Sequence, residues 1–118
     1  MKLTQLDFDK QAINRLVVYM QEHCTEPFNV QKHASIIYFS TSKLNKVFKM
    51  HQGVGPGTYF RKLRIAKALE LYKNGNSNWT EISYLVGYAD LPSFSKAFKR
   101  VTGVNPKNFG VMSNKLIE

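Results

Sequence analysis

The chain has 118 residues, of which 43% are hydrophobic, and it carries 17 Lys and Arg against 8 Asp and Glu, a formal net charge of +9. This length suits one compact domain or two very small ones that share an element. The single cysteine excludes an intramolecular disulfide and fits a reducing cytoplasm, while no apolar run reaches the length of a membrane span or a signal peptide core. We therefore expect a cytoplasmic protein with no membrane partner.

Basic residues are concentrated in two stretches without any carboxylate, 27–69 and 91–117. The first stretch holds eight Lys and Arg and the second holds five. A surface that serves only solubility usually mixes both signs of charge. Acid-free stretches of this length favour an anionic partner, most often a nucleic acid.

Hydrophobic spacing predicts helices along the whole chain and no convincing strand. The first expected helix starts after an N-cap at Asp7 or Asp9 and ends near Glu26. The second covers about 30–37, and the third runs from an N-cap at Ser40 to Gly53. The fourth expected helix begins at Pro56 and ends at 74–76, and the fifth covers about 80–85 before Gly87. The sixth runs from an N-cap at Asp90 to Gly103, and a short seventh helix begins at Pro106.

One segment of the chain is written twice, with an offset of 50 residues. Residues 42–49, followed by Gly53 and Pro56, correspond to residues 92–99, followed by Gly103 and Pro106. A repeat of this length indicates that each copy is one supersecondary unit. In each copy a short helix, a tight turn and a capped second helix form a helix-turn-helix, which places its second helix in the major groove of DNA.

The second helix of each unit has one apolar and one polar face at about 100° per residue. The inward positions are Leu44, Val47 and Phe48 in the first unit, and Phe94, Ala97 and Phe98 in the second. The outward positions are Ser42, Lys46 and Lys49 beside Asn45, and Pro92, Lys96 and Lys99 beside Ser95. A solvated helix face is the ordinary alternative, but two acid-free faces in register favour a surface that contacts bases or phosphates.

These residues resemble the DNA-binding domain of the AraC/XylS family of bacterial transcription regulators over about 12–111. The first unit carries the motif as Ala34, Ser40, Leu44, Phe48-Lys49, Gly53, Pro56 and Tyr59, followed by a linker helix with Leu63-Arg64-Ile65-Ala66-Lys67-Ala68. The second unit carries it as Ile82-Ser83, Gly87-Tyr88, Phe94, Phe98-Lys99 and Gly103-Val104-Asn105-Pro106.

The resemblance implies an all-α fold of about seven helices, with two helix-turn-helix subdomains joined by a linker helix. The expected domain covers 9–112, with a first unit over about 12–58, the linker helix over about 57–73 and a second unit over about 78–112. It further implies a sequence-specific transcription regulator that binds double-stranded DNA in adjacent major-groove faces, about 34 Å apart, and contacts RNA polymerase. The residues implied to contact DNA are Thr41, Ser42, Lys43, Asn45, Lys46, Lys49, Leu91, Pro92, Ser93, Ser95, Lys96, Lys99 and Arg100.

Several residues depart from the family pattern. His33 replaces an aliphatic core residue, and we expect its side chain to be partly buried and hydrogen-bonded. Gly110 stands where a basic residue is common, so one contact with the DNA backbone is expected to be missing. Lys46 and Lys96 replace frequent arginines, and a lysine point charge discriminates guanine less sharply than an arginine fork.

Catalysis, cofactors and metals are not expected. The three histidines lie far apart with no paired cysteines, which argues against a zinc site. Gly53, Gly55 and Gly57 lack the preceding strand and the following Gly-Lys-Ser/Thr of a phosphate loop. We interpret Asp7 and Asp9 as helix caps, and Trp79 with the many Tyr and Phe as packing residues.

Two other classes of function remain open at this point. A sequence-independent or architectural nucleic-acid-binding protein would use only the charge, and a protein-interaction module would bind acidic partners. Short polar residues beside the lysines favour sequence-specific binding, because charge alone does not require them. We also expect association with the nucleoid, no small-molecule effector site in this chain, and an origin as the C-terminal domain of a larger regulator.

Overall fold

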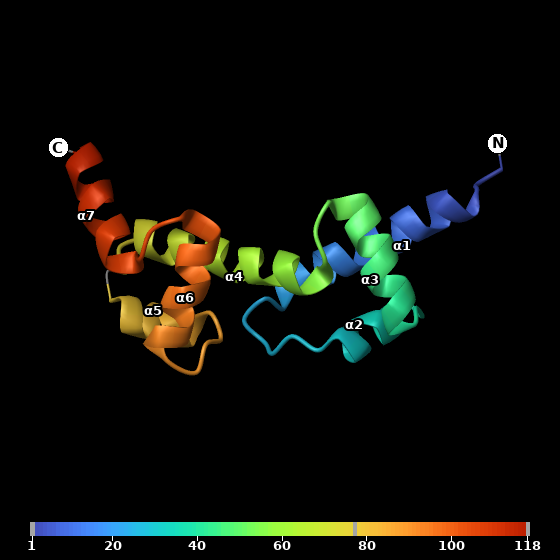
Figure 1. Cartoon of the computed structure of the whole chain (residues 1–118), viewed down its shortest axis with the longest axis horizontal. Coiled ribbons are helices and arrows are strands. Elements are labelled where there is room, and N and C mark those ends of the chain that lie inside the picture. The colour runs from blue at the N-terminus through green and yellow to red at the C-terminus, as the bar shows by residue number, and fades with distance from the viewer. Residues whose placement is uncertain (1, 77, 118) are drawn as a thin grey trace. The chain divides into compact units, whose positions relative to one another are not determined.

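The computed structural model describes residues 2–76 and 78–117, with side chains as far as residue 112. The elements in chain order are α1 (Gln5–Glu22), α2 (Val30–Ile36), α3 (Thr41–Gln52), α4 (Pro56–Lys73), α5 (Trp79–Leu85), α6 (Leu91–Thr102) and α7 (Pro106–Ile117) (Figure 1). These described residues contain no strand. The prediction of an all-α chain with about seven helices is confirmed.

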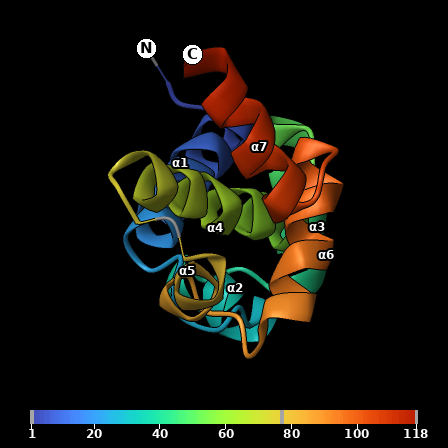
Figure 2. The same ribbon diagram turned by 90° about the vertical axis from the view of Figure 1, so that its left-hand side faces the viewer.

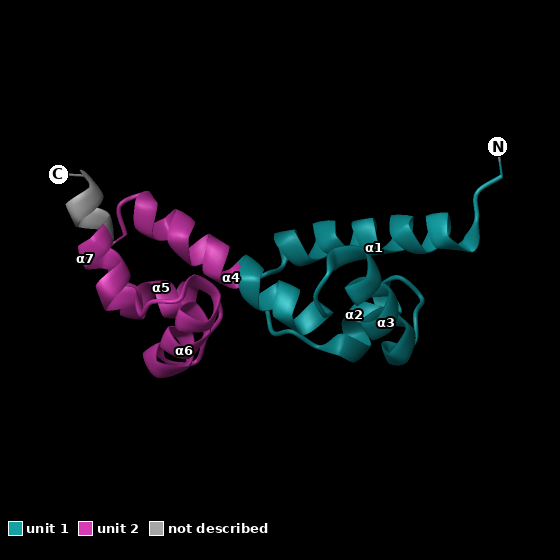
Figure 3. Cartoon of the chain, turned by 45° about the horizontal axis from the view of Figure 1, so that its top comes forward, with its two compact units in different colours: residues 1–63 teal, residues 64–118 magenta. Residues whose placement is uncertain are grey.

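The helices form two compact units, Met1–Leu63 and Arg64–Glu118, whose boundary lies inside α4 (Figure 3). Each unit has its own core of buried side chains. The first core includes Ile13, Leu16, Met20, Leu44, Phe48 and Phe60. The second includes Ile65, Ala68, Ile82, Val86, Phe94 and Phe98. Helix α4 therefore contributes to both cores, with Phe60 on one side of the boundary and Ile65 on the other.

Helices α3 and α6, called the reading helices below, begin and end in the same way. The side chains of Ser40 and Asp90 accept a hydrogen bond from the backbone N–H three residues later, at 3.1 and 2.8 Å. Gly53 and Gly103 end the helices in the left-handed region (φ 81° and 87°), where glycine carries no Cβ penalty. Their N–H groups donate to the carbonyl four residues earlier, at 2.8 Å in both units. The predicted boundaries of both helices are confirmed.

The turn before each reading helix differs between the units by one residue. The N-caps Asn29 and Asn78 of α2 and α5 are 49 residues apart, whereas those of α3 and α6 are 50 apart. The extra residue lies in the turn that joins α5 to α6 (Figure 2). Tyr38 (φ 60°) therefore holds the position that Gly87 (φ 99°) holds in the second unit. In both turns, the N–H of the following residue donates to the carbonyl five residues earlier, at 2.9 Å.

The start of α1 differs from the sequence prediction. Its N-cap is Thr4, whose hydroxyl accepts from the Asp7 N–H at 3.2 Å while the Asp7 carboxylate accepts from the Thr4 N–H at 2.9 Å. This reciprocal pair is a capping box, so Asp7 lies in the first turn and Asp9 lies further inside the helix. The prediction of an N-cap at Asp7 or Asp9 was therefore wrong. Helix α7 also has 12 residues and is not short.

His33 is more deeply buried than predicted, with 3% of its surface exposed. Its Nδ1 donates to the Asn29 carbonyl at 2.7 Å, but its Nε2 has no hydrogen-bond partner among the described residues. The imidazole packs beside the rings of Phe28, Tyr19 and Phe60, at centroid distances of 4.9, 5.8 and 5.6 Å. The ring thus fills core volume as an aliphatic residue would, with one nitrogen left unpaired.

Tyr38 generates a prediction about stability. It is the non-glycine residue with positive φ among the described residues, and its side chain is 96% exposed. A left-handed backbone costs a non-glycine residue roughly 1–2 kcal/mol, and substitution by glycine removes this cost. Part of the gain is lost because glycine has greater conformational entropy in the unfolded chain. Tyr38→Gly should therefore raise the free energy of unfolding by about 0.5–1 kcal/mol in denaturant titrations. Tyr38→Ala keeps the backbone strain and should give no comparable gain; equal gains would contradict this explanation.

The Asp90 cap predicts acid sensitivity of the second unit. Hydrogen bonds from the backbone and side chain of Ser93 lower the pKa of Asp90 below its ordinary value of 3.8, against an opposing effect of burial. Because the pKa of Asp90 is lower in the folded state, its carboxylate stabilises the fold when the pH is above the unfolded-state pKa. This stability is lost as the pH falls through the folded-state pKa. Asp90→Asn should keep the cap at neutral pH and flatten the dependence of the melting temperature on pH below about 4. An unchanged pH profile would contradict this role.

The separate cores predict separate unfolding. Phe98 is fully buried in the second core, and truncation of a buried Phe to Ala typically costs ~3–5 kcal/mol. Phe98→Ala should therefore unfold mainly the second unit: in hydrogen exchange, amides of residues 94–99 should exchange freely while those of 44–49 stay protected. Phe48→Ala is the matched control and should give the reverse pattern. Loss of protection in both segments from either change would show one cooperative unit.

Candidate nucleic-acid interface

The polar face of α3 is exposed to solvent, and its opposite face is buried in the first core. Leu44 and Phe48 are fully buried and Val47 is 6% exposed. The exposed side chains on the other face are Ser42, Asn45, Lys46, Lys49 and Met50. The rotation of α3 about its axis is therefore the one that its hydrophobic spacing predicted.

Helix α6 presents a comparable face in the second unit. Phe94 and Phe98 are fully buried, and Ala97 is 8% exposed. The exposed side chains are Pro92, Ser93, Lys96, Lys99 and Arg100. The register of the repeat is thus preserved, since Lys46 and Lys96 hold equivalent outward positions.

Four lysines of the reading helices form no ion pair with the residues that the structure describes. Ion pairs in the described part of the chain join His23 to Glu26, Lys43 to Asp9 and Lys67 to Glu70. Lys46, Lys49, Lys96 and Lys99 are in none of these pairs, and neither reading helix has an acidic residue in its first turn. Their positive charge is therefore available to an external anion.

Lys43, by contrast, has partners inside the first unit. Its Nζ lies 3.3 Å from an Asp9 Oδ1 atom and 4.4 Å from the centroid of the Phe39 ring. The same Asp9 oxygen accepts a hydrogen bond from Gln5 Nε2 at 2.9 Å. Helix α1 thus ties the first turn of α3 through one carboxylate.

The ion pair of Asp9 with Lys43 was not predicted from the sequence. Its partner Lys43 is distant in sequence, so local patterns do not reveal the pair. One signal was present: Asp9 is in helical phase with the apolar stripe of α1 at Ile13, Leu16 and Met20, and it is buried like them. A carboxylate on an apolar stripe requires a partner, because burying an unpaired charge is costly.

The environment of Asp9 keeps the carboxylate ionised. The hydrogen bond from the Gln5 amide is the largest influence that lowers the pKa of Asp9, and Lys43 and the nearby His51 lower it further. Burial acts in the opposite direction without cancelling these effects. The Asp9 side chain therefore faces Lys43 as a carboxylate at neutral pH.

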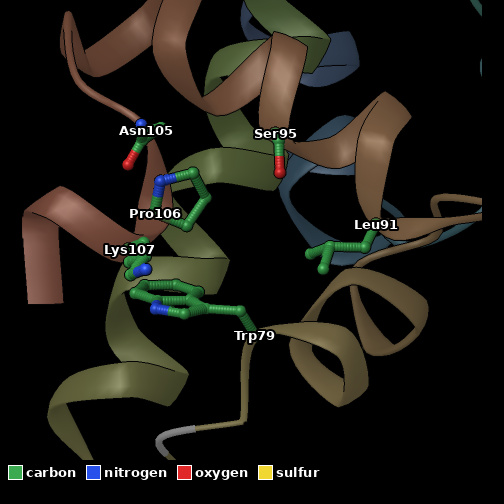
Figure 4. A pocket seen from close by; sticks show the side chains of 6 residues that line it. All are labelled: Trp79, Leu91, Ser95, Asn105, Pro106 and Lys107. Atoms are coloured by element: carbon green, nitrogen blue, oxygen red, sulfur yellow. The ribbon is translucent and has the colours of Figure 1, made fainter.

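Leu91 and Ser95 of α6 are half-buried and line a hollow of about 350 Å³ in the second unit (Figure 4). The other lining residues are Trp79, Asn105, Pro106 and Lys107. The aromatic and proline rings and the Leu91 side chain make this hollow mostly apolar. These two predicted contact residues are therefore less exposed than Pro92, Ser93, Lys96, Lys99 and Arg100 on the same helix.

The aromatic residues around Trp79 in the second unit pack together as the sequence predicted. Trp79 stacks on Tyr72, with ring centroids 4.6 Å apart and an interplanar angle of 4°, and meets Phe98 edge-on at 5.3 Å. Gly110 lies against this group, where an added Cβ would come within 3.2 Å of the Tyr72 hydroxyl. The prediction was wrong for Tyr38, Phe8 and Tyr84, whose side chains are exposed.

Other kinds of site find no support in the part of the chain that the structure describes. Among these residues, no group of three or more His, Cys, Asp or Glu side chains is placed to hold a metal ion. None of the helices searched there combines the length and apolar character needed to cross a membrane.

Comparisons with known proteins agree with this geometry. The model of the helix-turn-helix domain family matches residues 33–110. The HTH-type transcriptional activator RhaS of Escherichia fergusonii is 30% identical over 95 residues, 80% of this chain and 34% of that protein. The raffinose operon transcriptional regulatory protein RafR of Pediococcus pentosaceus is 31% identical over 99 residues, 84% of this chain and 36% of that protein. The chain spans about a third of the length of these relatives.

Solved structures share the fold. The C-terminal domain of AraT, a response regulator from Geobacillus stearothermophilus, has a TM-score of 0.76 and 26% identity over 92% of this chain and 86% of that one. The DNA-binding domain of AdpA, solved with a target DNA, has a TM-score of 0.76 and 22% identity over 82% of this chain and 87% of that one. A transcriptional regulator from Chromobacterium violaceum with an AraC-type DNA-binding domain has a TM-score of 0.77 and 22% identity, covering 84% and 88%. The chain therefore belongs to the AraC-type helix-turn-helix family of transcription regulators, as its sequence motifs predicted.

Proposed function

We propose that this chain is the sequence-specific DNA-binding domain of a bacterial transcription regulator, and that α3 and α6 each enter the major groove of duplex DNA. The observation that carries this proposal is the pair of reading helices with matching ends. Each buries an aromatic anchor and exposes lysines without acidic partners beside short polar residues. The family membership and the AdpA domain solved with its target DNA support the same function.

The proposed domain covers 9–112, with the unit and linker boundaries expected from the sequence. We assign base readout to the exposed polar face of each reading helix, where lysine, Asn and Ser can reach base edges. Flanking residues would contact phosphates and fix the register. The proposed contact residues are Thr41, Ser42, Asn45, Lys46 and Lys49 in α3, and Leu91, Pro92, Ser93, Ser95, Lys96, Lys99 and Arg100 in α6. Lys43, which the family resemblance also implied as a DNA contact, is left out of this proposal because its Nζ lies 3.3 Å from the Asp9 carboxylate.

Two helix-turn-helix units on one chain would allow a single copy to recognise a long site. We propose that the two reading helices enter successive major-groove faces, about 34 Å apart along the duplex. Leu91 and Pro92 at the start of α6 suit thymine methyl groups, which are the apolar feature of the major groove. Lys46 and Lys96 supply point charges, so guanine preference at these positions should be softer than with arginine.

Further partners follow from the same class of protein. RhaS is a transcriptional activator and RafR regulates the raffinose operon. By analogy we infer contact with RNA polymerase, a cytoplasmic location at the nucleoid, and a role in binding without catalysis. Effector binding would then belong to another part of a regulator and not to this chain.

A sequence-independent, architectural mode of binding is the second candidate. It is supported by the net charge of +9 and by the two acid-free stretches, which would attract any polyanion. It does not account for the exposed Ser42 and Asn45 beside Lys46, because phosphate binding requires no short polar residues at the same face.

Lys46→Ala separates the two candidates. A preferred duplex would first be selected from a pool of random sequences, and affinity would then be measured for a panel of single-base variants. Lys46→Ala should weaken binding to the preferred duplex by ~1–3 kcal/mol and relax the preference at one or two base pairs. Lys62, exposed on α4 outside the reading helices, is the matched control. Lys62→Ala should weaken all duplexes about equally, and identical behaviour of the two variants would favour the architectural mode.

A further inference from the structure

Lys43 lies in the first turn of a proposed reading helix, yet its charge is already neutralised within the first unit. Its ammonium is 3.3 Å from the Asp9 carboxylate of α1 and packs over the Phe39 ring of the preceding turn. None of the other lysines on the two reading helices has an acidic partner among the described residues.

The carboxylate is better held than the lysine. The Asp9 side chain is 12% exposed and keeps a second hydrogen bond, from Gln5 Nε2, whereas the Lys43 side chain is 41% exposed. If Lys43 moved to a DNA phosphate, Asp9 would remain nearly buried, and among the described residues it would keep the hydrogen bond from the Gln5 amide and the more distant influence of His51. Removing one member of such a pair is costly because it leaves an uncompensated charge. A phosphate therefore competes poorly for Lys43.

The second unit shows what this pairing achieves. At the position equivalent to Lys43, α6 has Ser93, an uncharged residue. With Lys43 paired to Asp9, neither reading helix has an unpaired lysine in its first turn. The exposed cations left on equivalent positions are then Lys46 with Lys96 and Lys49 with Lys99.

We propose that Asp9 is a specificity-determining positioning residue, which holds Lys43 away from the DNA backbone and so prevents a phosphate contact that would strengthen binding to every sequence. This inference rests on the proposed function. Specificity is the ratio between affinity for the preferred site and affinity for other DNA, so an added sequence-independent contact lowers it.

The test measures affinity of the full chain for a selected duplex and a scrambled duplex as a function of salt. Asp9→Asn should release Lys43 to the backbone and steepen the slope of log affinity against log salt by roughly 0.9, the value for one additional phosphate contact. Affinity for the scrambled duplex should rise and the ratio between the two duplexes should fall. Lys43→Met added to Asp9→Asn should restore the original slope, whereas Lys43→Met with Asp9 intact should leave the slope unchanged.

Asp7→Asn is the matched control, because it removes the same charge from α1 two residues away without touching Lys43. An equal steepening with Asp7→Asn would show a general charge effect and overturn the proposal. A slope that becomes shallower by roughly 0.9 with Lys43→Met alone would also overturn it, since Lys43 would then contact a phosphate despite Asp9. This single variant decides the matter even if Asp9→Asn fails to fold in thermal melts. Absence of salt-dependent binding by the unaltered chain would instead contradict the proposed function itself.

Discussion

The burial of one aromatic anchor under each reading helix is the interaction on which the rest of the interface depends. Phe48 meets Tyr59 edge-on at 5.4 Å, and Phe98 is surrounded by Trp79, Phe94 and Phe109 at 5.3–5.6 Å. An α-helix with one face fixed in a core has no freedom to rotate about its axis. The identity of the exposed side chains therefore follows from the position of the anchor and the period of 3.6 residues.

The two units reach the same geometry with different core chemistry. The second core is dominated by stacked and edge-on aromatic rings around Trp79. The first core relies more on aliphatic side chains of α1 and places the His33 imidazole among three aromatic rings. Such cores resist repacking by simple exchange of residues, since shape and volume must match locally. Equivalent helix ends are kept nevertheless, because caps and left-handed glycines act locally.

Sequence alone predicted what local physics controls. The Ser40 and Asp90 caps, the terminal glycines 53 and 103 and the apolar phase of both reading helices depend on residues within a few positions of each other. The errors have two causes. Competing local signals misplaced the start of α1, where Thr4 and not Asp7 or Asp9 is the N-cap. Tertiary contacts, which no short window contains, decide the pairing of Asp9 with Lys43 and the depth of His33.

Tyr38 illustrates a third limit on such predictions. Aromatic residues at core spacing are usually buried, but Tyr38 falls where the backbone needs a left-handed residue, a place that the second unit fills with Gly87. Because this backbone requirement decides the position of Tyr38, its ring lies outside the core, with 96% of the residue's surface exposed, although the ring is hydrophobic. Because the two turns differ by one residue, an alignment of the repeat at a constant offset of 50 residues does not pair Tyr38 with Gly87.

Charge on this chain has to meet two opposing requirements. A net charge of +9 speeds encounter with DNA and strengthens binding to every sequence, while a regulator must distinguish one site among many. Lysines on the outward faces serve both purposes only where short polar neighbours convert proximity into base contacts. A lysine without such a use is better paired within the protein. The Asp9 carboxylate can pair with Lys43 in this way because it lies on the inner face of α1. Under the proposal made for Asp9, the selectivity of the first unit depends on a carboxylate of α1 as well as on the proposed contact residues of the reading helices.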